Sequence, residues 1–473
     1  MASENISFDT LPSSIRKPGK YFEFNTKLAV RTLPANIQKM LIVAQRTAAG
    51  TQDPLTVVQV YSDAEAAEYF GVGSLAHLMC RAAIKANAYL HLSVIGIDDD
   101  EAGIAATGTI AVTGPSTGIG VVEAQIGSQT VQIAVSLADT AAAIAAELAN
   151  KINGYPSLPV TAAVAEGVVT LTARNKGAAG NCIPVYATSA TDGVTVAATA
   201  MTSGAVDPDI TEALATVFAD GHHIICTPYT SQTSLTILRQ HLDAVSHALE
   251  QRGAVGVAAT TGTLAAATTL AGLVNSGRIT LAVAPASDSL PCEVAAAYAA
   301  VIASEEDPAR PLNTLALTGI APPPFAKRLG RMEQETALWN GVTPLEVGPG
   351  EVVQIVRAIT TYTVDAQGVD DIALLDLTTI RTLDYVRKAC RERIALRFPR
   401  EKLSSRTPPK VRSELLDVLY KLEQLEIVEE VKANAEGLIC ERDLQDPNRL
   451  DAKIPCDVVN GLHIFAGRID LLL

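Results

Sequence analysis

The sequence Gly114-Pro115-Ser116-Thr117-Gly118 is the one stretch with the letters of a catalytic motif, the nucleophile elbow G-x-S-x-G. In such an elbow, a serine on a tight turn between a strand and a helix attacks an acyl group. Here a proline follows the first glycine, and strand-like sequence rather than a helix follows the second. The pattern therefore favours a turn in a β-rich segment over a catalytic serine.

The histidines and acidic residues do not show the spacing of a metal site. His222-His223 leads into an apolar run, and His241 and His247 lack the i, i+4 spacing of a helical pair. HExxH and the Cys/His spacings of zinc sites are absent from the sequence. Asp98-Asp99-Asp100-Glu101 lacks the alternation and glycine of a calcium loop, so we expect a solvated loop there. We predict no metal and no other cofactor.

Nucleotide-binding motifs are also missing. The sequence has no GxxxxGK[ST], and neither Gly71-Val72-Gly73 nor Gly118-Ile119-Gly120 completes G-x-G-x-x-G. One alternative is a hydrolase of subtilisin-like fold, which needs Ser, His and Asp within hydrogen-bond reach. We identify no such constellation and predict that the protein is not an enzyme. Labelling with a fluorophosphonate would test for a reactive serine.

Composition indicates a large globular protein with an acidic surface. The 473 residues are 48% apolar, and the net charge is −14. This charge argues against a general nucleic-acid binder, because phosphate contacts need clustered Lys and Arg. Scattered cysteines without a CxxC pair are typical of buried thiols in a reducing compartment. They lie at positions 80, 182, 226, 292, 390, 440 and 456.

Membrane and secretion signals are not found in the sequence. No stretch approaches the roughly 18 apolar residues of a membrane span, so we expect no direct insertion into a membrane. Residues Met1 to Ser14 are polar and lack the apolar centre of a signal peptide. This argues against a further alternative, a non-enzymatic surface protein, because ordinary secretion would need such a signal.

Strands alternating with helices predict an α/β core domain over residues 26–95 and 208–375. Helices of this length between buried strands imply a mostly parallel sheet covered on both faces. The predicted strands are 39–44, 90–95, 223–226, 254–259, 279–284 and 352–362. The predicted helices are one opening at Ser62-Asp63-Ala64-Glu65 and others over 75–88, 212–219, 231–252, 264–275 and 294–304.

Residues 96–207 differ in composition from the flanking segments and are predicted to be an inserted β-rich domain. They are rich in Gly, Ala, Thr and Val and contain only three basic residues, Lys151, Arg174 and Lys176. Strands are predicted over 109–112, 130–135 and 167–172, with one helix over 140–153. The flanking segments look like halves of one α/β pattern, which is why we interpret this part as an insertion.

The next segment, 376–455, is predicted to be a mixed α+β C-terminal domain that contains a basic helix over 378–398. The candidate contact residues on this helix are Arg387, Lys388, Arg391 and Arg397. Arg387 and Arg391 are i, i+4 neighbours, as are Arg393 and Arg397. Two interpretations remain open: a solvated helix face, or an electrostatic contact with an acidic partner. A second helix is predicted over 411–425.

Both ends of the chain contain apolar, strand-like sequence. The C-terminal arm, 456–473, ends in three leucines, and the N-terminal arm, 1–25, contains Gly19-Lys20-Tyr21-Phe22-Glu23-Phe24-Asn25. Chain ends are normally polar and solvated, so these arms are expected to pair as strands within or between subunits. The candidate inter-subunit residues are Tyr21, Phe22, Phe24, Leu462, Ile464, Phe465, Ile469 and Leu471.

Several stretches, in this order along nearly the whole chain, resemble the contractile tail sheath proteins of Mu-like bacteriophages. Their specificity comes from the order, because none is a catalytic fingerprint. Residues 6–9 through 15–21 resemble the family's N-terminal arm, and 158–162, 169–177 and 180–181 resemble its β-rich insertion. Residues 379–387 and 397–403 are similar to the start of its C-terminal sheath domain.

The resemblance implies a fold and a mechanical role. The fold would be a subtilisin-like α/β core with a β-rich inserted domain, a mixed α+β sheath domain and extended terminal arms. Subunits would polymerise helically around a tail tube, exchange strands through their arms, and contract to drive the tube through the host envelope. Strain stored in the extended lattice would supply the energy, so no nucleotide site is required.

The resemblance also implies partners and a location. Expected partners are further copies of the chain, the tail tube protein, and baseplate and tail terminator proteins, with no nucleic acid. The basic helix would face the tube, and the insertion would lie on the outside. The protein would be part of the virion tail, assembled in the host cytoplasm.

Overall fold

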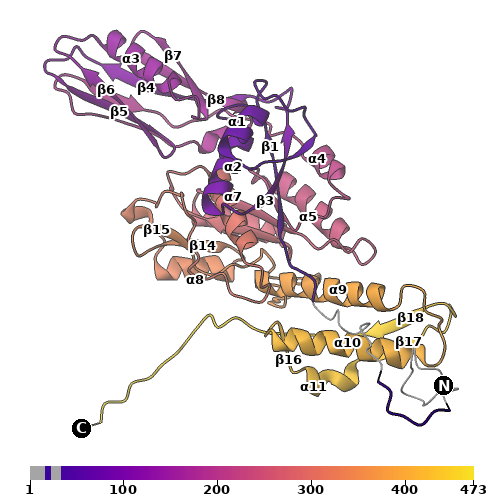
Figure 1. Ribbon diagram of the computed structural model, residues 1–473. Helices are drawn as coiled ribbons and strands as arrows, with labels where there is room; N and C mark the ends of the chain where they lie inside the picture. Colours follow the sequence, from indigo (N-terminus) through magenta and orange to yellow (C-terminus); the bar gives the residue numbers. More distant parts are fainter. Residues whose placement is uncertain (1–15, 23–32, 473) are drawn as a thin grey trace.

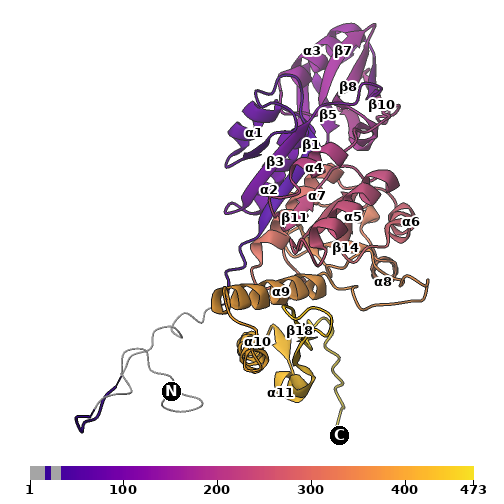
Figure 2. The same cartoon turned by 90° about the vertical axis from the view of Figure 1, so that its right-hand side faces the viewer.

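The computed structural model describes residues 16–22 and 33–472. Figure 1 shows three blocks in a row: a β-rich module at one end, an α/β core in the middle and a C-terminal domain at the other end. The long helix α9 (Leu377–Arg397) runs between the core and the rest of the C-terminal domain in both views (Figures 1 and 2). The polypeptide therefore passes through α9 on its way from the core to the C-terminal domain.

The core is built on an eight-stranded sheet with the order β15-β14-β13-β12-β11-β1-β3-β2. Its six inner strands are parallel, and β2 and β15 add to the edges in antiparallel fashion. The strands are β1 (Lys39–Gln45), β2 (Val57–Gln59), β3 (His91–Ile97), β11 (Ile224–Cys226), β12 (Val255–Thr260), β13 (Ile279–Val283), β14 (Thr343–Gly348) and β15 (Val352–Ile355).

Helices cover both faces of this sheet, which confirms the predicted buried parallel sheet. Side chains of a strand alternate between faces, so Met40 and Ile42 join one apolar cluster while Leu41 and Val43 join another. The first face carries α1 (Asp63–Phe70), α2 (Leu75–Ala86) and α7 (Pro291–Ser304). The second carries α4 (Thr211–Thr216), α5 (Gln232–Ser246), α6 (Leu264–Val274) and α8 (Arg331–Trp339).

Two predicted elements end well before their predicted last residues. The helix predicted over 231–252 stops at Ser246, because the chain must turn back to enter β12; Gln251 has φ +58° in that turn. The strand predicted over 352–362 stops at Ile355, and the residues after it leave the sheet. There the Ile359 amide donates to the Thr343 hydroxyl at 3.0 Å instead of to a strand neighbour.

The β-rich module consists of two antiparallel sheets and one helix. The sheets have the orders β10-β4-β8-β7 and β6-β5-β9. The strands are β4 (Ala105–Thr113), β5 (Gly120–Ile126), β6 (Gln129–Val135), β7 (Val160–Ala165), β8 (Val168–Lys176), β9 (Val185–Ser189) and β10 (Thr195–Ala198). The helix α3 (Ala141–Asn153) begins after the N-cap Thr140 and buries Ile144, Leu148 and Ile152, as its four-residue spacing predicts.

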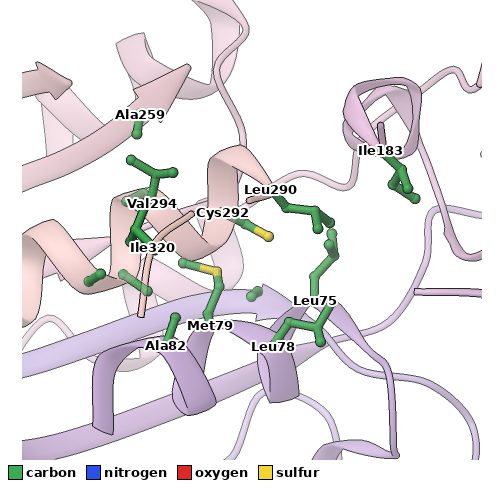
Figure 3. Packing of buried hydrophobic residues seen from close by; sticks show 14 of the residues in the cluster. Leu75, Leu78, Met79, Ala82, Ile183, Ala259, Leu290, Cys292, Val294 and Ile320 are labelled. Carbon is green, nitrogen blue, oxygen red and sulfur yellow. The ribbon is translucent and has the colours of Figure 1, made fainter. Parts of the chain in front are cut away.

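The module is joined to the core by both polar and apolar contacts. Asp99 accepts hydrogen bonds from Gln45 of β1 at 2.7 Å and from Asn175 of β8 at 3.0 Å. Figure 3 shows α2 facing α7, with Met79 opposite Cys292 and Leu290 pointing toward Leu75; Ile183 approaches from the module. These apolar residues belong to one buried cluster that spans both units.

The C-terminal domain has a separate apolar core. Besides α9 it contains α10 (Thr407–Gln424), β16 (Val428–Glu429), α11 (Val431–Asn434), β17 (Ile439–Arg442), β18 (Leu450–Lys453) and β19 (Asp457–Val458). Val386 and Cys390 of α9 pack with Leu415, Val418 and Leu422 of α10. Two short antiparallel pairs, β16 with β19 and β17 with β18, complete the domain. The chain leaves β19 directly into the C-terminal arm.

Replacing Leu78 by Ala tests the packing between α2 and α7. Leu78 is completely buried in the cluster shared by core and module, so Leu78→Ala should lower the free energy of unfolding by about 2–5 kcal/mol. Urea denaturation followed by circular dichroism measures this. Leu249→Ala is the matched control, because Leu249 is 85% exposed and its loss should change stability by less than about 0.5 kcal/mol. Equal effects of the two variants would refute the assigned packing.

Candidate assembly site: the domain junction and the C-terminal arm

The junction between the core and α9 is organised around the carboxylate of Asp384. Arg278 of the core binds it with two nitrogens, at 2.7 and 3.1 Å, and Arg387 of α9 binds it at 2.8 Å. The backbone comes unusually close at Gly253, where an added Cβ would lie 2.3 Å from the Asp384 carboxyl group. A glycine is therefore required there for the helix to approach the core.

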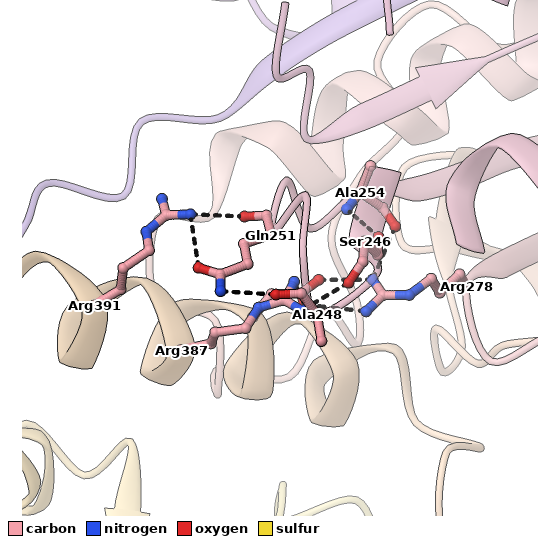
Figure 4. Close-up of polar contacts among 8 residues, drawn as sticks. Ser246, Ala248, Gln251, Ala254, Arg278, Arg387 and Arg391 are labelled. Atoms are coloured by element: carbon pink, nitrogen blue, oxygen red, sulfur yellow. Dashed lines mark hydrogen bonds and ion pairs between the residues drawn. The ribbon is translucent and has the colours of Figure 1, made fainter. Parts of the chain in front are cut away.

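Three of the predicted basic residues of α9 bind atoms of the core side (Figure 4 shows two of them). Arg387 donates to the Ser246 carbonyl at 2.7 Å, and Arg391 donates to the backbone carbonyl and the side chain of Gln251, each at 3.2 Å. Lys388 donates to the carbonyl of Ala35 at 2.9 Å. Each of these three cations is thus used within the chain to fix the position of the helix.

The fourth predicted residue, Arg397, lies on a different face of α9. It pairs with Glu414 of α10 at 3.4 Å. One turn before it, Arg393 is 4% exposed and pairs with Glu414 at 3.2 Å and Asp417 at 2.6 Å. The helix therefore carries two charged faces, one toward the core and one toward α10. Contact with a tube by Arg387, Lys388, Arg391 and Arg397 stays a prediction, to which the structure adds these partners within the chain.

Sequence reasoning missed other residues that shape the junction. Arg381 donates to the Glu305 carbonyl at 2.6 Å, and the Tyr385 hydroxyl donates to the Pro34 carbonyl at 2.9 Å. Their spacing was an available signal, because Arg381, Asp384, Tyr385 and Lys388 recur every three or four residues and so share one helix face. Arg278 gave no comparable signal, since it lies more than one hundred residues before Asp384 in the sequence.

The junction is a cationic environment with low solvent exposure. Burial lowers the pKa of Arg381 to about 10, although the nearby Glu305 and Asp307 act in the opposite direction. Burial, followed by the charges of Lys388 and Lys39, lowers the pKa of His223 to about 4. His223 is therefore neutral at physiological pH, and its Nδ1 accepts a hydrogen bond from the Lys39 amide at 3.2 Å.

The C-terminal arm extends away from the folded domains (Figure 1). Residues 459–472 contain no assigned strand or helix, and the predicted contact residues there are 80–99% exposed: Leu462, Ile464, Phe465, Ile469 and Leu471. Apolar and polar residues alternate from Arg468 to Leu471, as in a strand with one buried face. An exposed apolar run of this kind is expected to be covered by a partner.

The root of the arm is attached to the core. His463 lies 3.0 Å from the side-chain amide of Asn313 and 3.6 Å from the carboxylate of Asp376. Burial lowers the pKa of His463, and the charge of Arg357 acts in the same direction while Asp376 opposes it. Arg357 itself holds Asp376 with two hydrogen bonds, at 2.9 and 2.7 Å. The arm thus begins from a fixed point.

The described part of the N-terminal arm is short. Tyr21 is 44% exposed and donates to the Lys17 carbonyl at 3.1 Å, and Phe22 is 88% exposed. Phe24 lies outside the described residues. Within residues 16–22 and 459–472 no strand pairing is assigned, so the predicted pairing of the two arms stays a prediction.

The motifs considered for chemistry have structural roles. Gly114 to Gly118 forms the turn between β4 and β5, where the Ser116 hydroxyl donates to the Ser136 carbonyl and accepts from the Asp139 amide at 2.9 Å. Over the described ranges, no group of three or more His, Cys, Asp or Glu side chains is placed to hold a metal. Nor does any helix there have the length and apolarity needed to cross a bilayer.

The fold is shared with solved sheath proteins. The sheath tail protein of Desulfitobacterium hafniense aligns with a TM-score of 0.52 and 13% identity over 94% of this chain and 97% of its own. The helical sheath protein of the anti-feeding prophage in its contracted state aligns with a TM-score of 0.50 and 12% identity, over 96% and 98%. These likenesses define the class of fold, an α/β core with the added domains of a sheath protein.

Sequence comparison defines the family. Residues 203–361 match the phage tail sheath protein central domain, and 369–471 match the phage tail sheath C-terminal domain. The Mu-like prophage FluMu tail sheath protein of Haemophilus influenzae is 34% identical over 487 residues, covering 99% of this chain and 100% of the relative. The chain belongs to the phage tail sheath protein family. It is a structural protein and not an enzyme.

Replacing Asp384 by Ala tests the junction. The change leaves Arg278 and Arg387 without their shared acceptor in a poorly exposed site, which should cost about 1–3 kcal/mol. Limited proteolysis should then cut between the core and α9 at a lower protease concentration. Asp470→Ala is the control, because Asp470 is exposed and pairs with exposed Arg468 two residues away. Unchanged stability and cleavage in Asp384→Ala would show that the pair does not hold the domains.

Proposed function

We propose that the protein polymerises helically around a tail tube through its terminal arms and contracts to drive the tube through a host envelope. The observation that carries this proposal is the C-terminal arm, an apolar segment that is fully extended from a fixed root and uncovered in the single subunit. In a single subunit the apolar side chains of the arm are exposed to water. A neighbouring subunit would bury them.

Strand addition is the mode of contact that fits the arm best. An extended segment binds a sheet edge through its backbone, and alternate side chains fill pockets below. The short pair β16 and β19 lies immediately before the arm and offers such an edge. A contact between two different surfaces of identical subunits generates a ring or a helix, so one arm per subunit is enough to extend a polymer.

The structural neighbours support this proposal. Those described as the anti-feeding prophage helical sheath and the sheath complex of an extracellular contractile injection system are both in the contracted state, and another is described within the anti-feeding prophage baseplate. By analogy, we propose that this chain assembles with itself, a tail tube, a baseplate and a tail terminator. It would do so in the host cytoplasm and act in the virion tail.

A subtilisin-like relationship of the core is a further part of the proposal. Its support is the six-stranded parallel centre of the sheet with helices on both faces. This concerns ancestry of the fold alone, because function resides in sites and not in folds.

Charge substitutions in the arm test the polymerisation proposal. Ile469→Asp with Leu471→Asp should leave a folded subunit with unchanged thermal stability, because both side chains are more than 80% exposed. The variant should no longer form hollow cylinders in electron micrographs, since a charge buried between strands is unfavourable. Leu444→Asp, at an equally exposed position outside the arm, should form cylinders like the wild type. Normal cylinders from the arm variant would refute the proposed role of the arm.

We also propose that the solvent-facing part of α9 contacts the tube. Arg391 is exposed beyond its contact with Gln251, and basic residues continue after the helix at Arg400 and Lys402. Such a contact would be electrostatic and would weaken as salt increases. It does not require Arg387 or Arg397 to leave their partners within the chain.

Reversing the charge of Arg391 tests the tube contact; it removes the bonds to Gln251 but keeps the ion pairs of Asp384. Arg391→Glu should reduce co-sedimentation with purified tubes severalfold at low salt, while cylinders without tubes still form. Glu392→Arg, at the neighbouring exposed position, is the control and should not weaken binding. Unfolding curves of both variants must match the wild type. If Arg391→Glu binds tubes normally, α9 is not the tube contact.

A further inference from the structure

The junction between the core and α9 contains a cavity of about 190 Å³ that is partly open to solvent. This is far more than the volume that a single water needs. Residues from both sides line it, including His223 and Gly253 of the core and Arg381, Lys388 and Arg391 of α9. The cavity therefore lies where the relative position of the two domains is set.

Arg381 is the most unusual group in this cavity. Its side chain is 7% exposed, and Nη2 donates to the Glu305 carbonyl at 2.6 Å. Its Nη1 is buried and has no hydrogen-bond partner among the described residues. A buried charged donor without an acceptor is strongly unfavourable, and a guanidinium group is matched by the oxygens of a carboxylate or a phosphate.

Further donors line the same cavity. Lys388 uses one of its three N–H donors for the Ala35 carbonyl, which leaves two. The Nδ1 of His223 accepts from the Lys39 amide, so the neutral ring carries its proton on Nε2 and that nitrogen is a donor. Arg391 adds a third cation at the solvent side.

The acidic groups near the cavity do not cancel this charge. Asp384 is the one carboxylate among the lining residues, and Arg278 and Arg387 already hold it. Glu305 and Asp307 lie near Arg381 and offset part of its charge, but Arg381 donates to the backbone carbonyl of Glu305 and not to its carboxylate. The remaining charge of Arg381, Lys388 and Arg391 calls for an anion.

We propose that this cavity binds a small oxyanion, such as inorganic phosphate, between His223 of the core and Arg381 and Lys388 of α9. The anion would accept a proton of Lys388 through a charge-assisted hydrogen bond, with the charge of Arg381 beside it. Because its ligands come from both domains, a bound anion stabilises their observed arrangement. This site is separate from the arms, and it shares only Arg391 with the proposed tube contact.

Binding is measured by isothermal titration of the full chain with inorganic phosphate, against sodium chloride at equal ionic strength. Phosphate should bind with one site per chain and raise the midpoint of thermal unfolding, whereas chloride should not. Lys388→Gln keeps a donor for the Ala35 carbonyl but loses the charge, and it should bind phosphate at least fivefold more weakly. Arg381→Gln should abolish binding.

Lys410→Gln is the matched control, because Lys410 is 60% exposed on α10 and is not one of the residues that line the cavity. It should bind phosphate like the wild type. Since Arg381→Gln removes a buried side chain and can impair folding, the decision rests on Lys388→Gln. Equal effects of phosphate and chloride on the wild type, or less than a fivefold loss of affinity in Lys388→Gln, would overturn the proposal.

Discussion

The ion pairs of Asp384 are the constraint on which the arrangement of the domains depends. One carboxylate holds Arg278 from the core and Arg387 from its own helix, and Gly253 allows the close approach. Buried ionic groups are weak sources of stability but costly to leave unpaired. A different docking of α9 would leave Arg278 without the Asp384 carboxylate and Arg387 without the Ser246 carbonyl. The observed orientation of the helix is therefore selected by charge pairing rather than by apolar area alone.

Sequence patterns predicted the parts of the fold that depend on local order. Apolar runs such as 39–44 became inner strands, and Ser62 caps α1 by accepting from the Glu65 amide. The early end of α5 could not be foreseen, because it depends on where the chain must turn to reach β12. The same limit applied to the basic helix. Its charge was evident, but its partners Ser246 and Gln251 lie about 140 residues away.

The two faces of α9 explain why a run of arginines is found in an acidic protein. One face binds backbone carbonyls and Asp384 on the core side, and the other binds Glu414 and Asp417 of α10. Arginine suits both tasks, because its planar group donates several hydrogen bonds in fixed directions. The sequence left two interpretations of the basic helix open, a solvated face and a contact with an acidic partner. The structure adds a third, contacts with other parts of the same chain. Most of the basic helix is an internal connector.

Asp376 links this connector to the arm. It is the N-cap residue of α9, yet its carboxylate does not cap the helix, because it pairs with Arg357 of the core and lies 3.6 Å from His463 at the arm root. If neighbouring subunits pull on the arm, the load reaches residues 461–463, where His463 is hydrogen-bonded to Asn313 of the core and lies beside Asp376. From there it passes to the core through Arg357 and to the C-terminal domain through α9. The ion pair between Arg278 and Asp384 ties α9 to the core about two turns beyond Asp376. The fixed arm root and the charged junction are therefore two halves of one mechanical connection.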